Sequence, residues 1–381
     1  MNPNHWGKYQ EAQPETHFDP LQSFIVDNRP VGFRVNFMPG RRNRPREQSI
    51  RTPKSFLQEE ITDEEIRNSP LHQVIIGKAP AVPIAGDDQI IGDPSDEPRT
   101  MEFLDYDGVT IMNKYAPLGL YSQQASGVAM VNFATKYTRT LNNYQTNYHL
   151  LVPMRRSIQY LTSGQSYRDD LRTPVCFFNI GPGSGASIRY LHSQTYILPA
   201  YGGTISYAFQ QAFNQNDDCL ACRMANQKVV TDHLGQVIDY HQLTIWEDDH
   251  IRVIVPYAPL RTMATRILPK GHIAHLGQAD DEQLTSIAKG LSIADYLMNA
   301  ATPSGRTVRL DRSIPFRQAA RIDANFHLFI DLLPPFPFVA AEVTDFLGMT
   351  PYRPDEIATR MNQVDERRVE QLLDDASTME S

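Results

Sequence analysis

The feature that most constrains this chain is a glycine-rich turn that leads directly into a strand. The segment from Asn179 to Gln194 reads Asn-Ile-Gly-Pro-Gly-Ser-Gly-Ala-Ser-Ile-Arg-Tyr-Leu-His-Ser-Gln, and Thr-Tyr-Ile-Leu follows it. The apolar run Pro-Val-Cys-Phe-Phe at 174–178 indicates a buried strand before the turn. Because alternate residues of a strand share a face, Tyr190, His192 and Gln194 are expected to point the same way.

This arrangement is typical of phosphoryl chemistry at a histidine. A glycine-rich loop offers backbone N–H groups that can bind phosphate. A histidine beside the loop can attack phosphorus and hold a nucleotidyl group covalently. The amide of Gln194 can donate to phosphate oxygens without adding charge. The plain alternative is that His192 is a hydrogen-bonded histidine of the strand with no catalytic role.

Composition narrows the classes of partner. The 381 residues carry a formal net charge of −8, which argues against nucleic acid but leaves room for a nucleotide at a local basic cluster. No apolar run is long enough to span a bilayer, and the first ten residues lack the core of a signal peptide. Three cysteines make no disulfide framework, so we expect a cytoplasmic protein without a membrane partner.

The second half of the chain repeats the first in outline. The similar segments are 246–259 and 109–117, 267–272 and 150–155, and 325–328 and 190–193. We therefore expect an α+β fold made by internal duplication, with antiparallel sheets and packed helices. The expected divisions are an N-terminal arm at 1–60, a first half with the glycine-rich motif at 61–215, a second half at 216–362, and a charged tail at 363–381.

Residue patterns also predict individual elements. The expected helices lie at 61–68, 155–171 and 282–298, with a frayed helix in the tail. The expected strands are Phe24–Val26, Phe33–Phe37, Gly108–Met112, Tyr148–Val152, Val175–Ile180 and Thr195–Leu198.

On these residues the chain resembles galactose-1-phosphate uridylyltransferase and its relatives, the nucleotidyltransferase branch of the histidine-triad superfamily. The family motif N-x-G-x-x-x-G-[AC]-S-x-x-H-x-H-x-Q is matched without a gap, except that Tyr190 stands at the first histidine. The Gly-Ala-Ser variant also resembles the nucleotide-sugar phosphorylases of this branch. The resemblance implies a duplicated histidine-triad-like unit, a homodimer, and a nucleotide sugar with a sugar 1-phosphate or phosphate as substrates.

The resemblance also implies the site residues. Three are assigned to catalysis, and they are His192, Gln194 and Ser187. Seven are assigned to substrate binding, and they are Asn179, Gly185, Ala186, Arg41, Arg44, Asn113 and Glu342.

The implied activity is transfer of a nucleoside monophosphate through a covalent nucleotidyl-histidine. The second nitrogen of His192 should donate to a backbone carbonyl, expected in the Gly183–Gly185 region. One alternative is a phosphorylase acting on a nucleotide sugar or a dinucleoside polyphosphate. Another is a retired enzyme that only binds nucleotides.

Metal ligands differ between the two halves. The family often holds zinc in its first half, but no cysteine precedes Cys176 and Tyr190 replaces a ligand, so no metal is expected there. In the second half Cys219 and Cys222 form a C-x-x-C that would bind structural zinc with a suitable histidine pair. His272 is the first candidate partner, and His275 or His327 could complete the set. The transfer reaction would not require this zinc ion.

Overall fold

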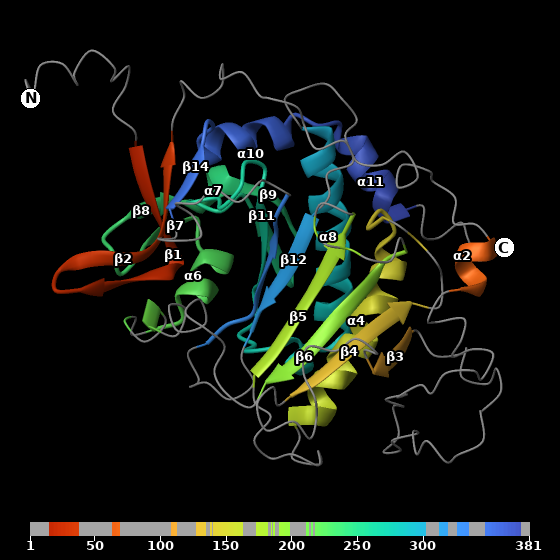
Figure 1. The fold of residues 1–381 in the computed structure, drawn as a ribbon. Coiled ribbons are helices and arrows are strands. Elements are labelled where there is room, and N and C mark those ends of the chain that lie inside the picture. Colours follow the sequence, from red (N-terminus) through yellow and green to blue (C-terminus); the bar gives the residue numbers. More distant parts are fainter. Residues whose placement is uncertain are drawn as a thin grey trace, which may run out of the picture.

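A nine-stranded sheet runs through the computed structural model, and the helices α4 (Tyr144–Thr162) and α8 (Asp281–Ala300) pack side by side against one of its faces (Figure 1). Among the described residues, no helix is long and apolar enough to cross a membrane. The structure describes residues 15–37, 63–68, 108–112, 127–134, 138, 140–162, 173–181, 184, 186, 190–198, 211–212, 215, 218–301, 312–318, 326–334 and 347–374.

The strand order of this sheet shows the internal repeat. The first half contributes the order β3-β4-β6-β5 and the second half the order β10-β11-β13-β12, while α4 follows β4 and α8 follows β11. The strands are β3 (Gly108–Met112), β4 (Val128–Ala134), β5 (Thr173–Ile180), β6 (His192–Leu198), β9 (Thr244–Glu247), β10 (Ile251–Ile254), β11 (Thr265–Pro269), β12 (Arg312–Arg317) and β13 (Phe329–Leu332). The repeat therefore rests on the same element order in both halves.

The two halves meet where β5 and β12 pair antiparallel in the middle of the sheet. Their register runs from Cys176 opposite Phe316 to Ile180 opposite Arg312. Phe178 and Ile314 face each other in this register, and both are fully buried beneath the helices. The join is thus a hydrogen-bonded ladder with an apolar helix-facing side.

The main core lies between this sheet and the two helices. Leu150, Leu151 and Met154 of α4 pack in one cluster with Ile287 and Leu291 of α8. Helix α8 begins at a capping box, in which Asp280 and Gln283 bond each other's backbone N–H groups. The helices thereby cover one face of the sheet along both halves.

The other face of the second half is covered by an N-terminal hairpin and a short helix. Strands β1 (Glu15–Val26) and β2 (Arg29–Phe37) turn at Asp27 and Asn28, whose positive φ angles of 49° and 59° suit a two-residue hairpin. Strand β14 (Leu347–Thr350) pairs parallel with β2. Leu21 of β1 packs with Leu220 of α6 (Leu220–Asn226) over the second half of the sheet.

Smaller elements lie in both halves and in the C-terminal region. They are α2 (Asp63–Arg67), β7 (Val229–Thr231), β8 (Val237–Asp239), α7 (Tyr240–Leu243), η6 (Leu276–Gln278), α10 (Pro354–Asn362) and α11 (Glu366–Asp374).

A buried ion-pair cluster ties the hairpin to the sheet. Arg266 of β11 donates to Asp19 of β1 at 2.9 Å and to Asp331 of β13 at 2.6 Å. All three side chains are at most 4% exposed. Asp19 also accepts from the backbone N–H of Leu21 and the amide of Gln22. The segment expected as an irregular arm therefore contributes a buried charge to the core of the second half.

Most of the predicted elements are confirmed. The strands expected at Phe24–Val26, Phe33–Phe37 and Gly108–Met112 lie in β1, β2 and β3, and those expected at 175–180 and 195–198 lie in β5 and β6. The helices expected at 61–68 and 282–298 are α2 and α8, and the tail holds α11. The α+β fold class with antiparallel pairing is confirmed as well.

The strand predicted near residue 150 is wrong, because Tyr148–Val152 lies inside α4. The helix predicted at 155–171 is confirmed over 155–162, the last part of α4, and 163–171 lies outside the described residues. Leu150, Leu151 and Val152 are all buried, so α4 is apolar on several sides and its short apolar run looks like a strand. The match of 267–272 with 150–155 fails for the same reason, since it aligns the end of β11 with a helix.

We predict that Asp19→Ala destabilises the protein by about 3 kcal/mol, because it leaves the guanidinium of Arg266 buried with one carboxylate instead of two. Chemical denaturation would measure the change. Asp249→Ala is the same substitution at an exposed aspartate, and it should change the free energy of unfolding by less than about 0.5 kcal/mol. Equal losses in the two variants would contradict the structural role of Asp19.

Candidate active site

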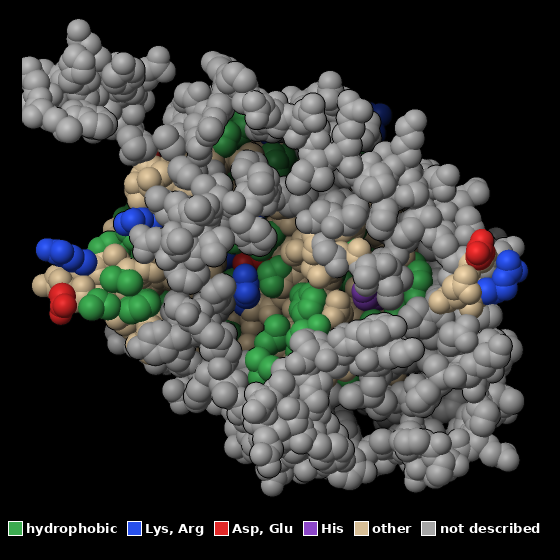
Figure 2. Space-filling model, viewed as in Figure 1, with side chains coloured by type: hydrophobic (Ala, Val, Ile, Leu, Met, Phe, Trp, Pro, Cys, Tyr) green, Lys and Arg blue, Asp and Glu red, His purple; other side chains and the backbone are tan. Residues whose placement is uncertain are grey.

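His192 is the first residue of β6, and its side chain lies on the sheet face opposite α4. The neighbouring residues of β6 show which side chains face α4 and which face away from it. Ser193 and Thr195 both accept from the side-chain amide of Asn132, which also bonds Ser157 of α4. Ser193 and Thr195 therefore face the helix, and His192, Gln194 and Tyr196 face away from it. From that side, hydrophobic, basic and histidine side chains are visible (Figure 2).

The imidazole of His192 is held in one tautomer. Its Nδ1 lies 3.0 Å from the backbone carbonyl of Tyr190, and because a carbonyl only accepts, Nδ1 carries the proton. The Gly183–Gly185 region was the predicted partner, and the structure gives Tyr190 instead. The chain bends at Tyr190, just before β6, and the carbonyl of Tyr190 bonds the ring two residues later. The remaining nitrogen, Nε2, then has the lone pair that a nucleophile requires.

Burial keeps this histidine neutral. The side chain is 4% exposed, and loss of solvation lowers the pKa of His192 from its usual value of 6.5. The bond to Tyr190 acts in the opposite direction but is the smaller effect. A neutral imidazole with a fixed Nδ1 proton is the reactive form for attack on phosphorus.

Gln194 follows on the same face and has an ordered amide. The Tyr196 hydroxyl donates to Gln194 Oε1 at 2.8 Å. Phe177 of β5 stands opposite Gln194 in the strand register and packs edge-on against the Tyr196 ring. The Oε1 acceptor is therefore used within the protein, which leaves the NH₂ group of Gln194 for other partners.

Asn179 stands beside His192 on the neighbouring strand. The ladder between the two strands ends with Phe178 opposite Ser193, so the next position brings Asn179 opposite His192. Ser313 of β12 donates to Asn179 Oδ1 at 3.3 Å. The second half of the chain thus contributes a hydrogen bond to a residue that the sequence assigns to substrate binding.

The glycine-rich turn begins directly after β5. Gly181 has a φ of 81°, a backbone conformation that favours glycine. The backbone N–H groups of Ser184 and Ala186 both donate to the Gly181 carbonyl, and the Ser184 hydroxyl bonds the same atom. The described part of the turn is therefore folded back on Gly181, close to the end of the strand that carries Asn179.

Tyr190 stands where the family motif has its first histidine. Its ring is 5% exposed and lies 5.6 Å from Phe133 and 6.4 Å from His192, measured between ring centroids. The aromatic ring thus packs against the nucleophile candidate. Arg155 of α4 binds the Ala279 carbonyl and Asp281 at the start of α8.

Of the ten residues that the sequence assigns to catalysis and substrate binding, the structure describes four, and they are Asn179, Ala186, His192 and Gln194. Six lie outside the described residues, and they are Ser187, Gly185, Arg41, Arg44, Asn113 and Glu342.

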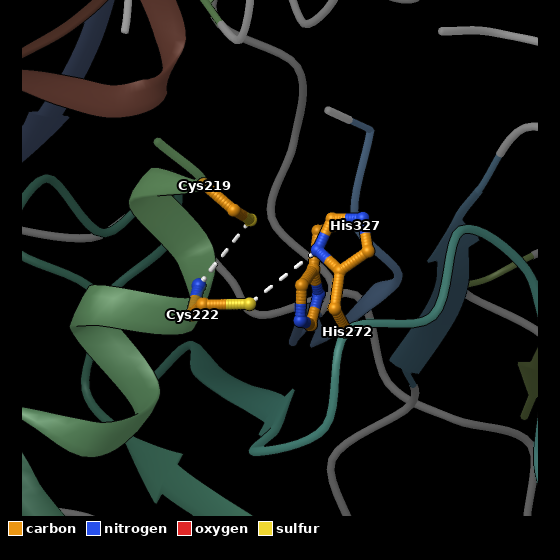
Figure 3. Close-up of side chains that lie close together, drawn as sticks. All are labelled: Cys219, Cys222, His272 and His327. Atoms are coloured by element: carbon orange, nitrogen blue, oxygen red, sulfur yellow. Dashed lines mark hydrogen bonds between the residues drawn. The ribbon is translucent and has the colours of Figure 1, made fainter. Parts of the chain in front are cut away.

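A separate cluster of cysteine and histidine side chains lies in the second half (Figure 3). Cys219 is the N-cap of α6 and accepts from the backbone N–H of Cys222 at 3.4 Å. His272, which follows β11, and His327, which precedes β13, face the two cysteines. One ligand atom from each of the four residues lies within 4.8 Å of the others.

The donor set of this cluster fits a tetrahedral metal ion. Two thiols and two imidazoles are a common structural zinc set. His327 Nδ1 bonds the Leu328 carbonyl, and its Nε2 is buried without a hydrogen-bond partner among the described residues. Burial lowers the pKa of His327 to about 4, so its ring is neutral as a ligand must be. His272 is the partner that the sequence favoured, and His327 completes the set.

The two thiols lie side by side and differ in acidity. The hydrogen bond from the Cys222 side chain lowers the pKa of Cys219 to about 6, while the same pairing and burial raise the pKa of Cys222. Cys219 is therefore ready to bind as a thiolate. His275, the other alternative, lies outside the cluster, where it is the N-cap of η6 and burial lowers its pKa to about 4.

Sequence reasoning missed two contacts of the site. The contact of Tyr196 could have been predicted, because Tyr196 lies two residues after Gln194 on a predicted strand and therefore shares its face. Ser313 could not, because only the pairing of β5 with β12 brings it to Asn179.

Comparison with known proteins places this geometry in a known fold. No family model matches the chain. ADP-glucose phosphorylase of Arabidopsis thaliana is 23% identical over 230 residues, which are 56% of this chain and 57% of that protein. The chain thus matches little more than half the length of that curated relative.

Solved structures align over more of the chain. The crystal structure of an ADP-glucose phosphorylase from Arabidopsis thaliana with bound ADP-glucose aligns with a TM-score of 0.66 and 18% identity, over 93% of this chain and all of that one. The chain has the fold of that phosphorylase. A uridylyltransferase structure aligns with a TM-score of 0.55 and 16% identity, over 73% of this chain and 91% of that chain. The resemblance noted from the sequence is confirmed at the level of the fold.

We predict that the midpoint of His192 protonation lies below pH 6.5, because burial lowers the pKa of the ring from that value. Protonation should appear only at lower pH, and any activity that needs the Nε2 lone pair should fall with it. Two-dimensional NMR of the imidazole nitrogens, assigned by loss of the signal in His192→Gln, would measure this. A midpoint above 6.5 would contradict the prediction.

Proposed function

We propose that this chain is a nucleotidyltransferase that moves a nucleoside monophosphate from a nucleotide sugar to phosphate or a sugar 1-phosphate. The observation that carries the proposal is the neutral, tautomer-fixed His192 beside the amides of Gln194 and Asn179. These groups offer one nucleophile and two neutral donors on one face of the sheet. Neutral amide donors can stabilise the negative charge of a phosphoryl group without a positively charged side chain.

The reaction has two steps at His192. In the first step Nε2 attacks the α-phosphorus, the N–P bond forms, and the P–O bond to the sugar phosphate breaks with its electron pair. In the second step an oxygen of the acceptor phosphate attacks the same phosphorus, and the N–P bond returns its pair to Nε2. Nδ1 keeps its proton throughout, because the Tyr190 carbonyl holds it.

Phosphate is the acceptor that we favour. The curated relative and the structure with the highest TM-score reported above are both ADP-glucose phosphorylases, and the latter was solved with ADP-glucose bound. The Gly-Ala-Ser variant of the motif agrees with that branch. ADP-glucose is therefore the first donor to test, with other nucleoside diphosphate-glucoses after it.

Three further assignments belong to this proposal. Zinc would bind Cys219, Cys222, His272 and His327 and would hold α6 against the loops before β13 and after β11, with no part in the reaction. A homodimer, with Glu342 reaching the sugar across its interface, follows from the resemblance. The cytoplasm is the compartment in which such free thiols stay reduced.

We predict that incubation with ADP-glucose labelled at the α-phosphate, followed by a quench in base, leaves label on the intact protein. A phosphorus–nitrogen bond to histidine survives base, and mass spectrometry would give the adduct mass. His192→Ala should abolish the adduct, whereas Cys176→Ser, on the helix-facing side of β5, should retain it. Phosphate should then release the label as ADP.

Absence of an adduct with every nucleotide sugar would contradict the transferase. If calorimetry then showed micromolar nucleotide binding, the retired binding protein would be the better account. Label that persists in His192→Ala would mean that another group is the nucleophile.

We predict that the purified protein binds one zinc ion per chain and that Cys222→Ser loses most of it. Four ligands hold the ion, and a serine hydroxyl is a poor replacement for a thiolate. Metal analysis after dialysis against a weak chelator would measure the content. Cys176→Ser is the matched control and should keep the zinc, since Cys176 is buried in β5 and is not part of the cluster. Equal zinc in both variants would refute the assignment.

A further inference from the structure

The hydroxyl of Tyr196 bonds a predicted catalytic residue, and nothing in the motif requires a phenol at this position. Its hydroxyl donates to Gln194 Oε1 at 2.8 Å. We propose that Tyr196 is a positioning residue, which fixes the Gln194 amide so that its NH₂ group faces the phosphoryl group being transferred. The inference rests on the proposed function, because it assigns a role within that reaction.

The chemistry of the amide makes its orientation matter. A glutamine side chain carries one acceptor and one donor group, and phosphate oxygens can only accept. The last torsion of a free glutamine is broad and nearly two-fold, so its oxygen would face the phosphate for much of the time. An oxygen in that position would repel the developing negative charge, and the donor would be lost.

The Tyr196 hydroxyl favours the orientation in which Oε1 accepts, because a phenol donates a hydrogen bond more strongly than it accepts one. In the observed arrangement Oε1 of Gln194 accepts from the phenol, and turning the amide over would exchange that bond for one in which the phenol must accept. Burial raises the pKa of Tyr196, so the phenol remains protonated and able to donate across the neutral pH range.

The phenol is itself held in place. The Phe177 ring stands at 89° to the Tyr196 ring with 5.3 Å between centroids, an edge-to-face contact. Phe177 is opposite Gln194 in the register of β5 and β6, so all three side chains lie on one face. The amide is therefore fixed by a donor that sits on a rigid pair of strands and not on a loop.

The test is a double-mutant cycle on Tyr196→Phe and Gln194→Ala, read as the single-turnover rate of nucleotidyl-enzyme formation with saturating nucleotide sugar. Tyr196→Phe should lower this rate by about tenfold, with little change in the KM or in thermal stability. In the Gln194→Ala background the same change should have almost no effect, because the group that Tyr196 positions is gone. Tyr148→Phe, which removes a phenol of α4 that bonds Asp281 on the other side of the sheet, is the matched control.

The outcomes separate this inference from the function on which it rests. If the unmodified protein forms no adduct with any nucleotide sugar, the proposed function fails. If the unmodified protein forms the adduct and Tyr196→Phe forms it at the same rate, the positioning role is refuted. A tenfold loss that is repeated in the Gln194→Ala background would also refute it, since Tyr196 would then act without the amide.

Discussion

The antiparallel pairing of β5 with β12 is the constraint on which the rest of the structure depends. It joins two repeats of the same element order into one sheet, and it lets α4 and α8 share a single core. It also brings Ser313 from the second half to Asn179 in the first. Neither half alone could supply both the strand with His192 and the hydroxyl that orders its neighbouring amide.

Duplication gives two similar sheet faces, and the chain uses them differently. In the second half, the hairpin β1–β2 and α6 cover the face away from the helices, and the charge of Arg266 is neutralised there by Asp19 and Asp331. Burying these three charges costs solvation, which offsets much of their mutual attraction, whereas removing one of them would leave a buried charge uncompensated. In the first half, the corresponding face carries His192, Gln194 and Asn179. The covered copy thus anchors the hairpin, and the other copy holds three of the predicted site residues.

Much of this could be predicted from the sequence, and the failures have a common physical cause. The motif from Asn179 to Gln194 predicts the turn, the strand and the shared face, because these are local and follow from glycine and strand alternation. The strand expected at 148–152 is wrong, because the continuously buried run 150–154 of α4 has no helical alternation of polar and apolar residues. The bond of Ser313 and the fourth ligand His327 depend on pairing between distant strands, which no local pattern records. The Tyr190 carbonyl was missed since a turn geometry, not a residue type, places it.

His192 and His327 show how one position in a repeat can serve two purposes. His192 begins β6 and His327 lies two residues before β13, the corresponding strand of the second half. In each, Nδ1 donates to a nearby backbone carbonyl, that of Tyr190 or of Leu328, and burial lowers the pKa of the ring. Each histidine is thus neutral with Nε2 unprotonated, the form that either attacks phosphorus or binds a metal. What differs is the partner: two amides lie near His192, and two thiols of α6 lie near His327. The backbone prepares the same lone pair twice, and the neighbouring side chains decide its chemistry.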